Sequence, residues 1–118
     1  QNANPFYEQV HAFKVMDIVE RAGKPFPAEV QVIALGRSVA WVGLPGEIFN
    51  EHGRAIKLAS PFPVTIVAEL ANGNLGYVPD RKAYSEGAYE VISSRVAAGS
   101  GEAMVASAVE QLVALFKD

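Results

Sequence analysis

The chain has 118 residues, of which 50% are hydrophobic and 19% are charged, so it can form one globular domain and is not disordered. Its net charge of −3 gives no electrostatic basis for binding nucleic acid or an anionic membrane. The absence of cysteine excludes disulfides and thiolate metal sites, and no apolar run reaches the roughly 18 residues that a transmembrane segment needs.

The first part of the chain predicts a helix followed by a β-hairpin. Apolar residues at helical spacing, a proline near the start and Gly23 at the end predict a helix over about 5–22. Two β-rich runs separated by a short polar turn predict an antiparallel hairpin over about 29–35 and 38–44. The second run is almost entirely apolar, so we expect it to be an inner strand.

The rest of the chain predicts alternating helices and strands. Apolar spacing and turn residues favour a helix from Glu47 to about 59, strands over 64–70 and 75–78, and helices over about 88–96 and 101–117. Strands interspersed with helices are typical of an α/β (α+β) fold. We expect a layered sheet with an antiparallel hairpin core, flanked by about three helices.

Two turns carry the candidate chemistry. Leu44-Pro45-Gly46-Glu47 and Gly76-Tyr77-Val78-Pro79 each follow β-rich sequence, and they place a glutamate and a tyrosine thirty residues apart. Structural interpretations stay open, because a carboxylate also suits the first turn of a helix and a tyrosine also suits an edge strand. A nearby phenol, Tyr89, can donate to developing negative charge or can cover a sheet edge. The two histidines, His11 and His52, are predicted to pack or to lie at the surface.

Familiar catalytic motifs are absent from the sequence. It has no nucleophile elbow, no phosphate-binding loop, no dinucleotide fingerprint and no paired-histidine zinc helix. A catalytic zinc site needs about three protein ligands, and two poorly spaced histidines do not supply them. Any complete zinc site therefore needs ligands from outside this chain.

The order of several short motifs is informative. Leu44-Pro45-Gly46-Glu47 comes first and is followed by Ala71-Asn72-Gly73, Gly76-Tyr77-Val78, Tyr84, Tyr89-Glu90, Ser93-Ser94 and Gly99-Ser100-Gly101. This order, with the twelve-residue step from Tyr77 to Tyr89, resembles the neutral/alkaline (non-lysosomal) ceramidase family over about residues 30–117. The similar region corresponds to the C-terminal part of that family's catalytic domain.

The resemblance implies a zinc-dependent amidohydrolase that cleaves an N-acyl amide, ceramide, into a sphingoid base and a fatty acid. Glu47 and Tyr77 match the family's metal-facing glutamate and tyrosine, and Tyr89 matches a tyrosine that hydrogen-bonds the oxyanion. Carboxylate and phenol oxygens suit Zn²⁺, which lowers the pKa of its water to about 7 and polarises the amide carbonyl. The family's zinc-binding histidines have no match here, which implies that an upstream N-terminal segment of the same protein supplies them.

We therefore interpret residues 1–118 as a single domain or segment, the C-terminal part of a ceramidase-like zinc hydrolase domain. It starts at Gln1 rather than Met, which favours a processed or excised piece of a longer protein. By itself it is expected to be inactive. If it is like the family, the whole protein is secreted or periplasmic. Two alternatives stay open, namely an independent small α/β binding or oligomerisation module and a catalytically degenerate family member.

Overall fold

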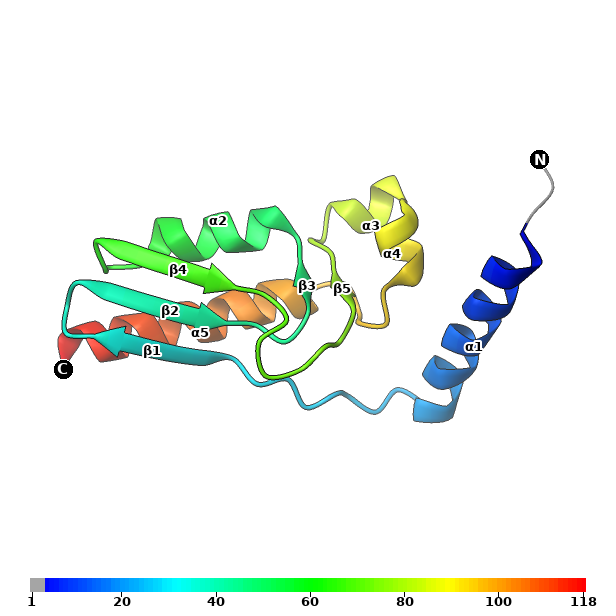
Figure 1. Cartoon of the computed structure of the whole chain (residues 1–118), viewed down its shortest axis with the longest axis horizontal. Coiled ribbons are helices and arrows are strands. Elements are labelled where there is room, and N and C mark those ends of the chain that lie inside the picture. The colour runs from blue at the N-terminus through cyan, green and yellow to red at the C-terminus, as the bar shows by residue number, and fades with distance from the viewer. Residues whose placement is uncertain (1–3) are drawn as a thin grey trace.

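A computed structural model describes residues 4–118, which form five helices and five strands in two small sheets (Figure 1). The helices are α1 (Pro5–Arg21), α2 (Asn50–Ala59), α3 (Ala83–Glu86), α4 (Tyr89–Ser93) and α5 (Ser100–Lys117). The strands are β1 (Gln31–Leu35), β2 (Val39–Gly43), β3 (Glu47–Ile48), β4 (Val64–Ala68) and β5 (Tyr77–Val78). The expected layered arrangement of helices and a sheet built on a hairpin is confirmed.

The larger sheet has the strand order β1-β2-β4, with the predicted inner strand β2 at its centre. β1 and β2 form the antiparallel hairpin, whereas β2 and β4 run parallel. Parallel neighbours require a crossover connection, and α2 lies in the connection between β2 and β4. The smaller sheet is the parallel pair β3 and β5.

One face of the larger sheet forms the core with α2 and α5. Residues alternate between the two faces of a strand, so Ala40 and Val42 of β2 point to the same side, and both are fully buried. They pack in one cluster with Ile56 of α2 and with three residues of α5 spaced four apart, Met104, Ala108 and Leu112. The cluster also takes in residues near the small sheet and the α2–β4 connection, Leu44, Phe62 and Val78.

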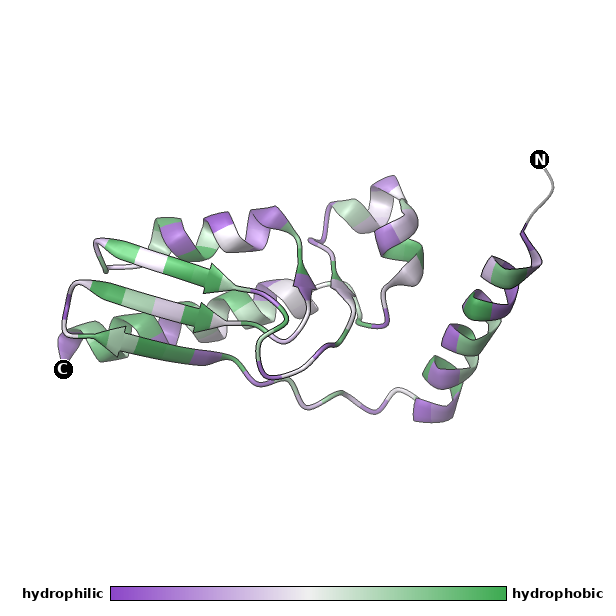
Figure 2. Cartoon of the chain, in the orientation of Figure 1, coloured by the Kyte–Doolittle hydropathy of each residue, from purple (hydrophilic) through white to green (hydrophobic). Residues whose placement is uncertain are grey.

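The opposite face of the same sheet is apolar but exposed. Ile33, Trp41 and Ile66 lie opposite one another on the three strands, and Leu35 and Val64 extend the row on the edge strands. All five are exposed, Trp41 to 37%. Figure 2 shows that the strands are largely hydrophobic. No layer formed by residues 4–118 covers this surface, which we call the outer sheet face.

Helix α1 projects from one end of the body, as Figure 1 shows, and the molecule measures 55 × 28 × 21 Å. Its start is capped by the side chain of Asn4, which accepts a hydrogen bond from the Phe6 N–H at 3.1 Å. Its C-terminal end is the left-handed residue Ala22, close to the predicted position. None of its residues is buried, so few contacts with the body hold the helix in place.

The prediction of a helix starting at Glu47 is wrong, because α2 begins only at Asn50. Glu47 and Ile48 instead form β3, and the Ile48 N–H on the other side of this strand donates to Glu69 Oε2 at 3.0 Å. The helix-dipole interpretation of Glu47 is therefore wrong. Glu47 pairs with a strand, not with a helix terminus.

Further boundaries differ from the predictions, and β5 is shorter than the strand predicted over 75–78. The strand expected over 64–70 ends at Ala68, and Leu70 adopts a left-handed conformation with φ of 53° that breaks the extended backbone. The helix expected over 88–96 is only α4, because Ser94 is extended with ψ of 142°. No helix among residues 4–118 has the length and apolar character needed to cross a membrane.

Candidate active site

The segment Leu44-Pro45-Gly46 is held by backbone hydrogen bonds on two sides. The Leu44 N–H donates to Ala68 O at 2.9 Å, and the Leu70 N–H donates to Gly46 O at 3.0 Å. A second segment approaches through the Leu75 N–H, which donates to Pro45 O at 2.8 Å. These bonds fix the turn that delivers the chain from the central strand β2 into β3.

Glu47 and Tyr77 are direct partners in the parallel pairing of β3 with β5. The Glu47 N–H donates to Gly76 O at 2.9 Å, and the Phe49 N–H donates to Val78 O at 3.2 Å. Opposite residues of paired strands present their side chains on the same face. The structure thus brings together the two residues that the sequence analysis singled out, although they lie thirty positions apart.

Gly46 allows this close pairing. A Cβ at Gly46 would lie 2.8 Å from the carbonyl oxygen of Gly76, which is closer than side chains tolerate, and 3.0 Å from a methyl group of Val78, which is a tight contact. A side chain here would push β3 away from β5. The glycine of the Pro-Gly-Glu turn is therefore a requirement of the backbone contact next to Glu47.

Tyr89 completes the group. It is the first residue of α4, which packs against β5, and its ring meets that of Tyr77 edge to face, with centroids 6.0 Å apart and planes at 77°. Tyr89 is 59% exposed, although its ring contacts Tyr77. All three predicted site residues therefore lie in one cluster at the small sheet.

The charge of Glu47 acts on the Tyr77 phenol. The carboxylate of Glu47 raises the pKa of the Tyr77 phenol above its ordinary value of about 10, and partial burial, Tyr89 and Glu90 raise it further. Removing the phenol proton would place a second negative charge beside the first. A bound cation would relieve that repulsion, so the donor set of Glu47 and Tyr77 fits a metal such as zinc.

A first prediction concerns this pKa. Glu47→Gln is expected to lower the pKa of Tyr77 toward its ordinary value, because the glutamate charge is the largest cause of the shift. The raised pKa contributes stability that is complete below about pH 10 and declines as the pH rises through the folded-state pKa. NMR titration of the tyrosine ring carbons would measure the change. Glu51→Gln, which removes an exposed charge paired with Arg54, serves as the control and should leave the Tyr77 pKa unchanged.

The described residues do not complete a metal site. No group of three or more His, Cys, Asp or Glu side chains among residues 4–118 is arranged to hold an ion. His52 is 3% exposed, and its ring fills the space against Gly101 between α2 and α5. It packs, as the sequence analysis expected, and the sign that could have revealed its burial is the glycine at a core position of the final helix.

A cavity of about 410 Å³ adjoins Tyr89, and the sequence analysis did not predict it. One wall is α1, through Tyr7, Val10, His11 and Lys14, and the other is α4, through Tyr89, Ile92 and Ser93. No sequence pattern indicates that α1 returns to α4, because the contact is non-local. The cavity gives a ligand room beside Tyr89.

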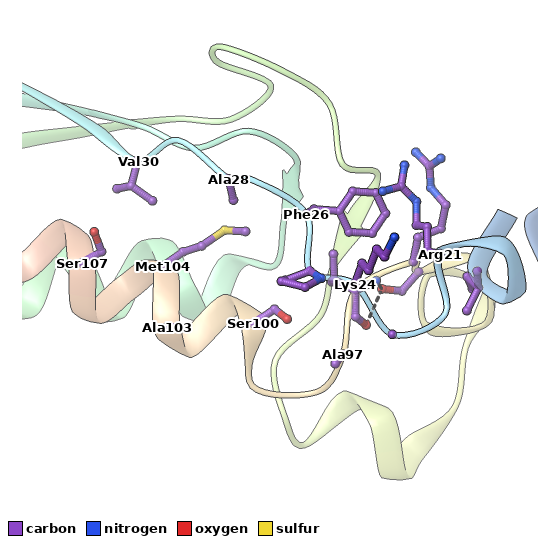
Figure 3. A pocket seen from close by; sticks show the side chains of 16 residues that line it. Arg21, Lys24, Phe26, Ala28, Val30, Ala97, Ser100, Ala103, Met104 and Ser107 are labelled. Atoms are coloured by element: carbon purple, nitrogen blue, oxygen red, sulfur yellow. Dashed lines mark hydrogen bonds between the residues drawn. The ribbon is translucent and has the colours of Figure 1, made fainter.

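A larger cavity of about 660 Å³ lies between the segment that follows α1 and the start of α5 (Figure 3). Arg21 stacks over the Phe26 ring at 3.7 Å, and Met104 lines the side formed by α5. Arg95, which also lines it, approaches Asp17 at 3.6 Å. None of Glu47, Tyr77 and Tyr89 lines this cavity, so it is separate from the cluster.

Comparison with known proteins supports the resemblance seen in the sequence. No protein-family model and no curated protein sequence matches the chain. Its structure matches neutral ceramidase from Pseudomonas aeruginosa with a TM-score of 0.62 and 24% identity, and a ceramidase complexed with C2 with a TM-score of 0.65 and 25% identity. Each match covers 75% of this chain but only 15% of the ceramidase chain. The chain therefore has a ceramidase-like fold, and the resemblance predicted from its motif order is confirmed.

Proposed function

We propose that this chain is the C-terminal part of the catalytic domain of a zinc-dependent amidohydrolase similar to neutral ceramidase. The observation that carries the proposal is the β3–β5 pairing, which sets Glu47 directly opposite Tyr77 within a ceramidase-like fold. Their two oxygen ligands would hold the ion together with histidines from an upstream segment. Zinc bound there would supply a Lewis acid for the amide carbonyl and an acidified water molecule.

Tyr89 has a different role in this proposal. Its ring contacts Tyr77 and the residue is 59% exposed, so in this proposal its hydroxyl reaches a substrate bound beside the cluster. A neutral phenol that donates a hydrogen bond stabilises the amide oxygen as negative charge develops on it. In this proposal Tyr77 binds the ion, and Tyr89 donates a hydrogen bond to the reacting oxygen.

The proposed substrate is an N-acyl amide with a lipid chain, such as ceramide. The cavity beside Tyr89 is lined by apolar side chains of Val10 and Ile92 as well as by Tyr7, which suits an aliphatic group. Of its polar side chains, His11 and Lys14 come from the same face of α1 and Ser93 comes from α4. An amide with an aliphatic tail matches this mixture of surfaces.

The upstream partner is supported by the outer sheet face. Soluble monomers rarely expose a large contiguous apolar surface, and such a surface normally marks a contact with another segment or molecule. Residues 4–118 leave the outer sheet face uncovered. We infer that an upstream segment of the same protein covers the outer sheet face and brings the zinc histidines.

The proposal is tested by comparing the isolated chain with the product of the complete gene that encodes it. We expect the gene to encode upstream histidines, and its product to bind zinc and to release fatty acid from an N-acyl amide. The isolated chain should bind zinc weakly and hydrolyse no amide, because two oxygen ligands are too few. Tight stoichiometric zinc in the isolated chain, measured by metal analysis after dialysis, would contradict the proposal. A gene product without upstream histidines would favour the degenerate alternative.

A further inference from the structure

The hydroxyl group of Ser94 binds the backbone of Tyr77 on the side of β5 that faces away from β3. The carbonyls of Gly76 and Val78 accept hydrogen bonds from β3, so the carbonyl of Tyr77 between them points the other way. Ser94 Oγ donates to this carbonyl at 3.0 Å and accepts from the Val96 N–H at 3.3 Å. Ser94 thus supplies the partner that the outer edge of a two-residue strand would otherwise lack.

Tyr84 also binds the segment that contains Ser94. Its hydroxyl donates to Val96 O at 2.7 Å and lies 3.3 Å from Ser94 Oγ. Each hydroxyl has a single proton, and the shortest contacts assign that of Tyr84 to Val96 and that of Ser94 to Tyr77. The two side chains are half-buried, so these bonds are partly shielded from competing water.

Ser94 also ends the helix that carries Tyr89. Its N–H donates to Val91 O at 3.1 Å, and its extended backbone terminates α4. A helix of five residues has little stability of its own, so its position depends on what anchors it. The anchor at its C-terminal end is the hydrogen bond from Ser94 to the carbonyl of Tyr77.

We propose that Ser94, supported by Tyr84, is a positioning residue that sets the placement of the Tyr89 ring relative to Tyr77. The inference rests on the proposed function for its catalytic meaning, but the positioning itself is a property of this chain. Besides the contact between the two rings, Tyr89 is joined to the Tyr77 carbonyl through the short helix α4 and the hydrogen bond of Ser94. A displacement of about 1 Å in an active site can cost on the order of 100-fold in rate.

The test measures the geometry of the two rings in the 118-residue chain. Nuclear Overhauser effects between the Tyr77 and Tyr89 ring protons should be strong in the unmodified protein, because the rings meet edge to face. Ser94→Ala is expected to weaken them at least twofold, and Ser94→Thr, which keeps the hydroxyl, should retain them. Ser85→Ala is the matched control, because it removes a serine hydrogen bond to the Lys82 carbonyl that does not involve Tyr77.

Tyr84→Phe is a second test variant, to be used if Ser94→Ala does not fold. It removes the donor to Val96 O but leaves the bond from Ser94 to Tyr77, so it should weaken the ring contacts less than Ser94→Ala does. Unchanged ring contacts in a folded Ser94→Ala protein, or in Tyr84→Phe where Ser94→Ala does not fold, would overturn the inference.

The same variants separate this inference from the proposed function. In the complete gene product, Ser94→Ala should lower kcat about tenfold or more with little change in KM, and Ser94→Thr should restore it. A gene product that hydrolyses no amide would refute the proposed function while the ring contacts still test the positioning. Normal turnover in a Ser94→Ala enzyme would overturn the catalytic meaning of the positioning and leave the function standing.

Discussion

Glu47→Gln in the complete gene product is expected to abolish measurable amide hydrolysis while the protein stays folded. In the proposed site the carboxylate would be one of two oxygen ligands from this chain, and glutamine has no negative charge to offer. Loss of an outer hydrogen-bond partner of a metal ligand already costs about 10–100-fold, so losing the ligand itself should cost at least about 100-fold. Zinc content per protein and fatty acid release would be measured together.

Glu51→Gln is the matched control for this experiment. Glu51 lies four residues further along, is exposed and has Arg54 as its ion-pair partner at 3.7 Å, so its removal makes the same charge change outside the cluster. Surface ion pairs of this kind contribute little to stability, and turnover should be unaffected. Full turnover in Glu47→Gln, or an equal loss in Glu51→Gln, would show that Glu47 does not bind the ion.

Gly101→Ala is expected to have the largest effect on folding. A Cβ at this position would overlap the His52 ring, with Cε1 only 2.6 Å away, and both residues are buried. Overpacking of a rigid aromatic ring in a close-packed interior typically costs about 1–3 kcal/mol and occasionally more. Urea denaturation followed by circular dichroism would report the loss in unfolding free energy.

Gly53→Ala in α2 is expected to stabilise the protein, in contrast to Gly101→Ala in α5. Nothing lies within 4 Å of a Cβ built at Gly53, and the residue is in the interior of α2. Alanine should therefore stabilise the protein by about 0.5–1 kcal/mol through its higher helix propensity. His52→Ala combined with Gly101→Ala should recover part of the loss, because the two side chains no longer compete for one space. Equal stabilities of the two glycine variants would refute the described packing.

The elements with strong local patterns could be predicted from the sequence, and those made by distant contacts could not. α5 and the β1–β2 hairpin were predicted to within about two residues, because apolar periodicity and turn residues determine them locally. β3 was missed, because Ile48, Phe49 and Ile56 have helical spacing and the competing partner of β3 lies thirty residues away. Tertiary pairing overrode local preference here.

The candidate site was likewise predictable only in part from the sequence. Glu47, Tyr77 and Tyr89 could be named from motif order, but their convergence depends on β3–β5 pairing and on the docking of α4, which no local pattern encodes. Their roles as metal ligands and oxyanion donor stay predictions. The contribution of Ser94 was not predictable, since a serine that ends a helix is common and only the position of the Tyr77 carbonyl gives it a partner.

The outer sheet face has a practical consequence for handling the isolated chain. The uncovered row of Ile33, Trp41 and Ile66 crosses all three strands, and β1 and β4 are edge strands. Another molecule can therefore pack on this face or pair with an edge. Concentrated solutions should therefore become turbid, and co-expression with the upstream segment should keep the polypeptide dispersed. The same surface would be removed from water by the assembly with an upstream segment that the proposed function requires.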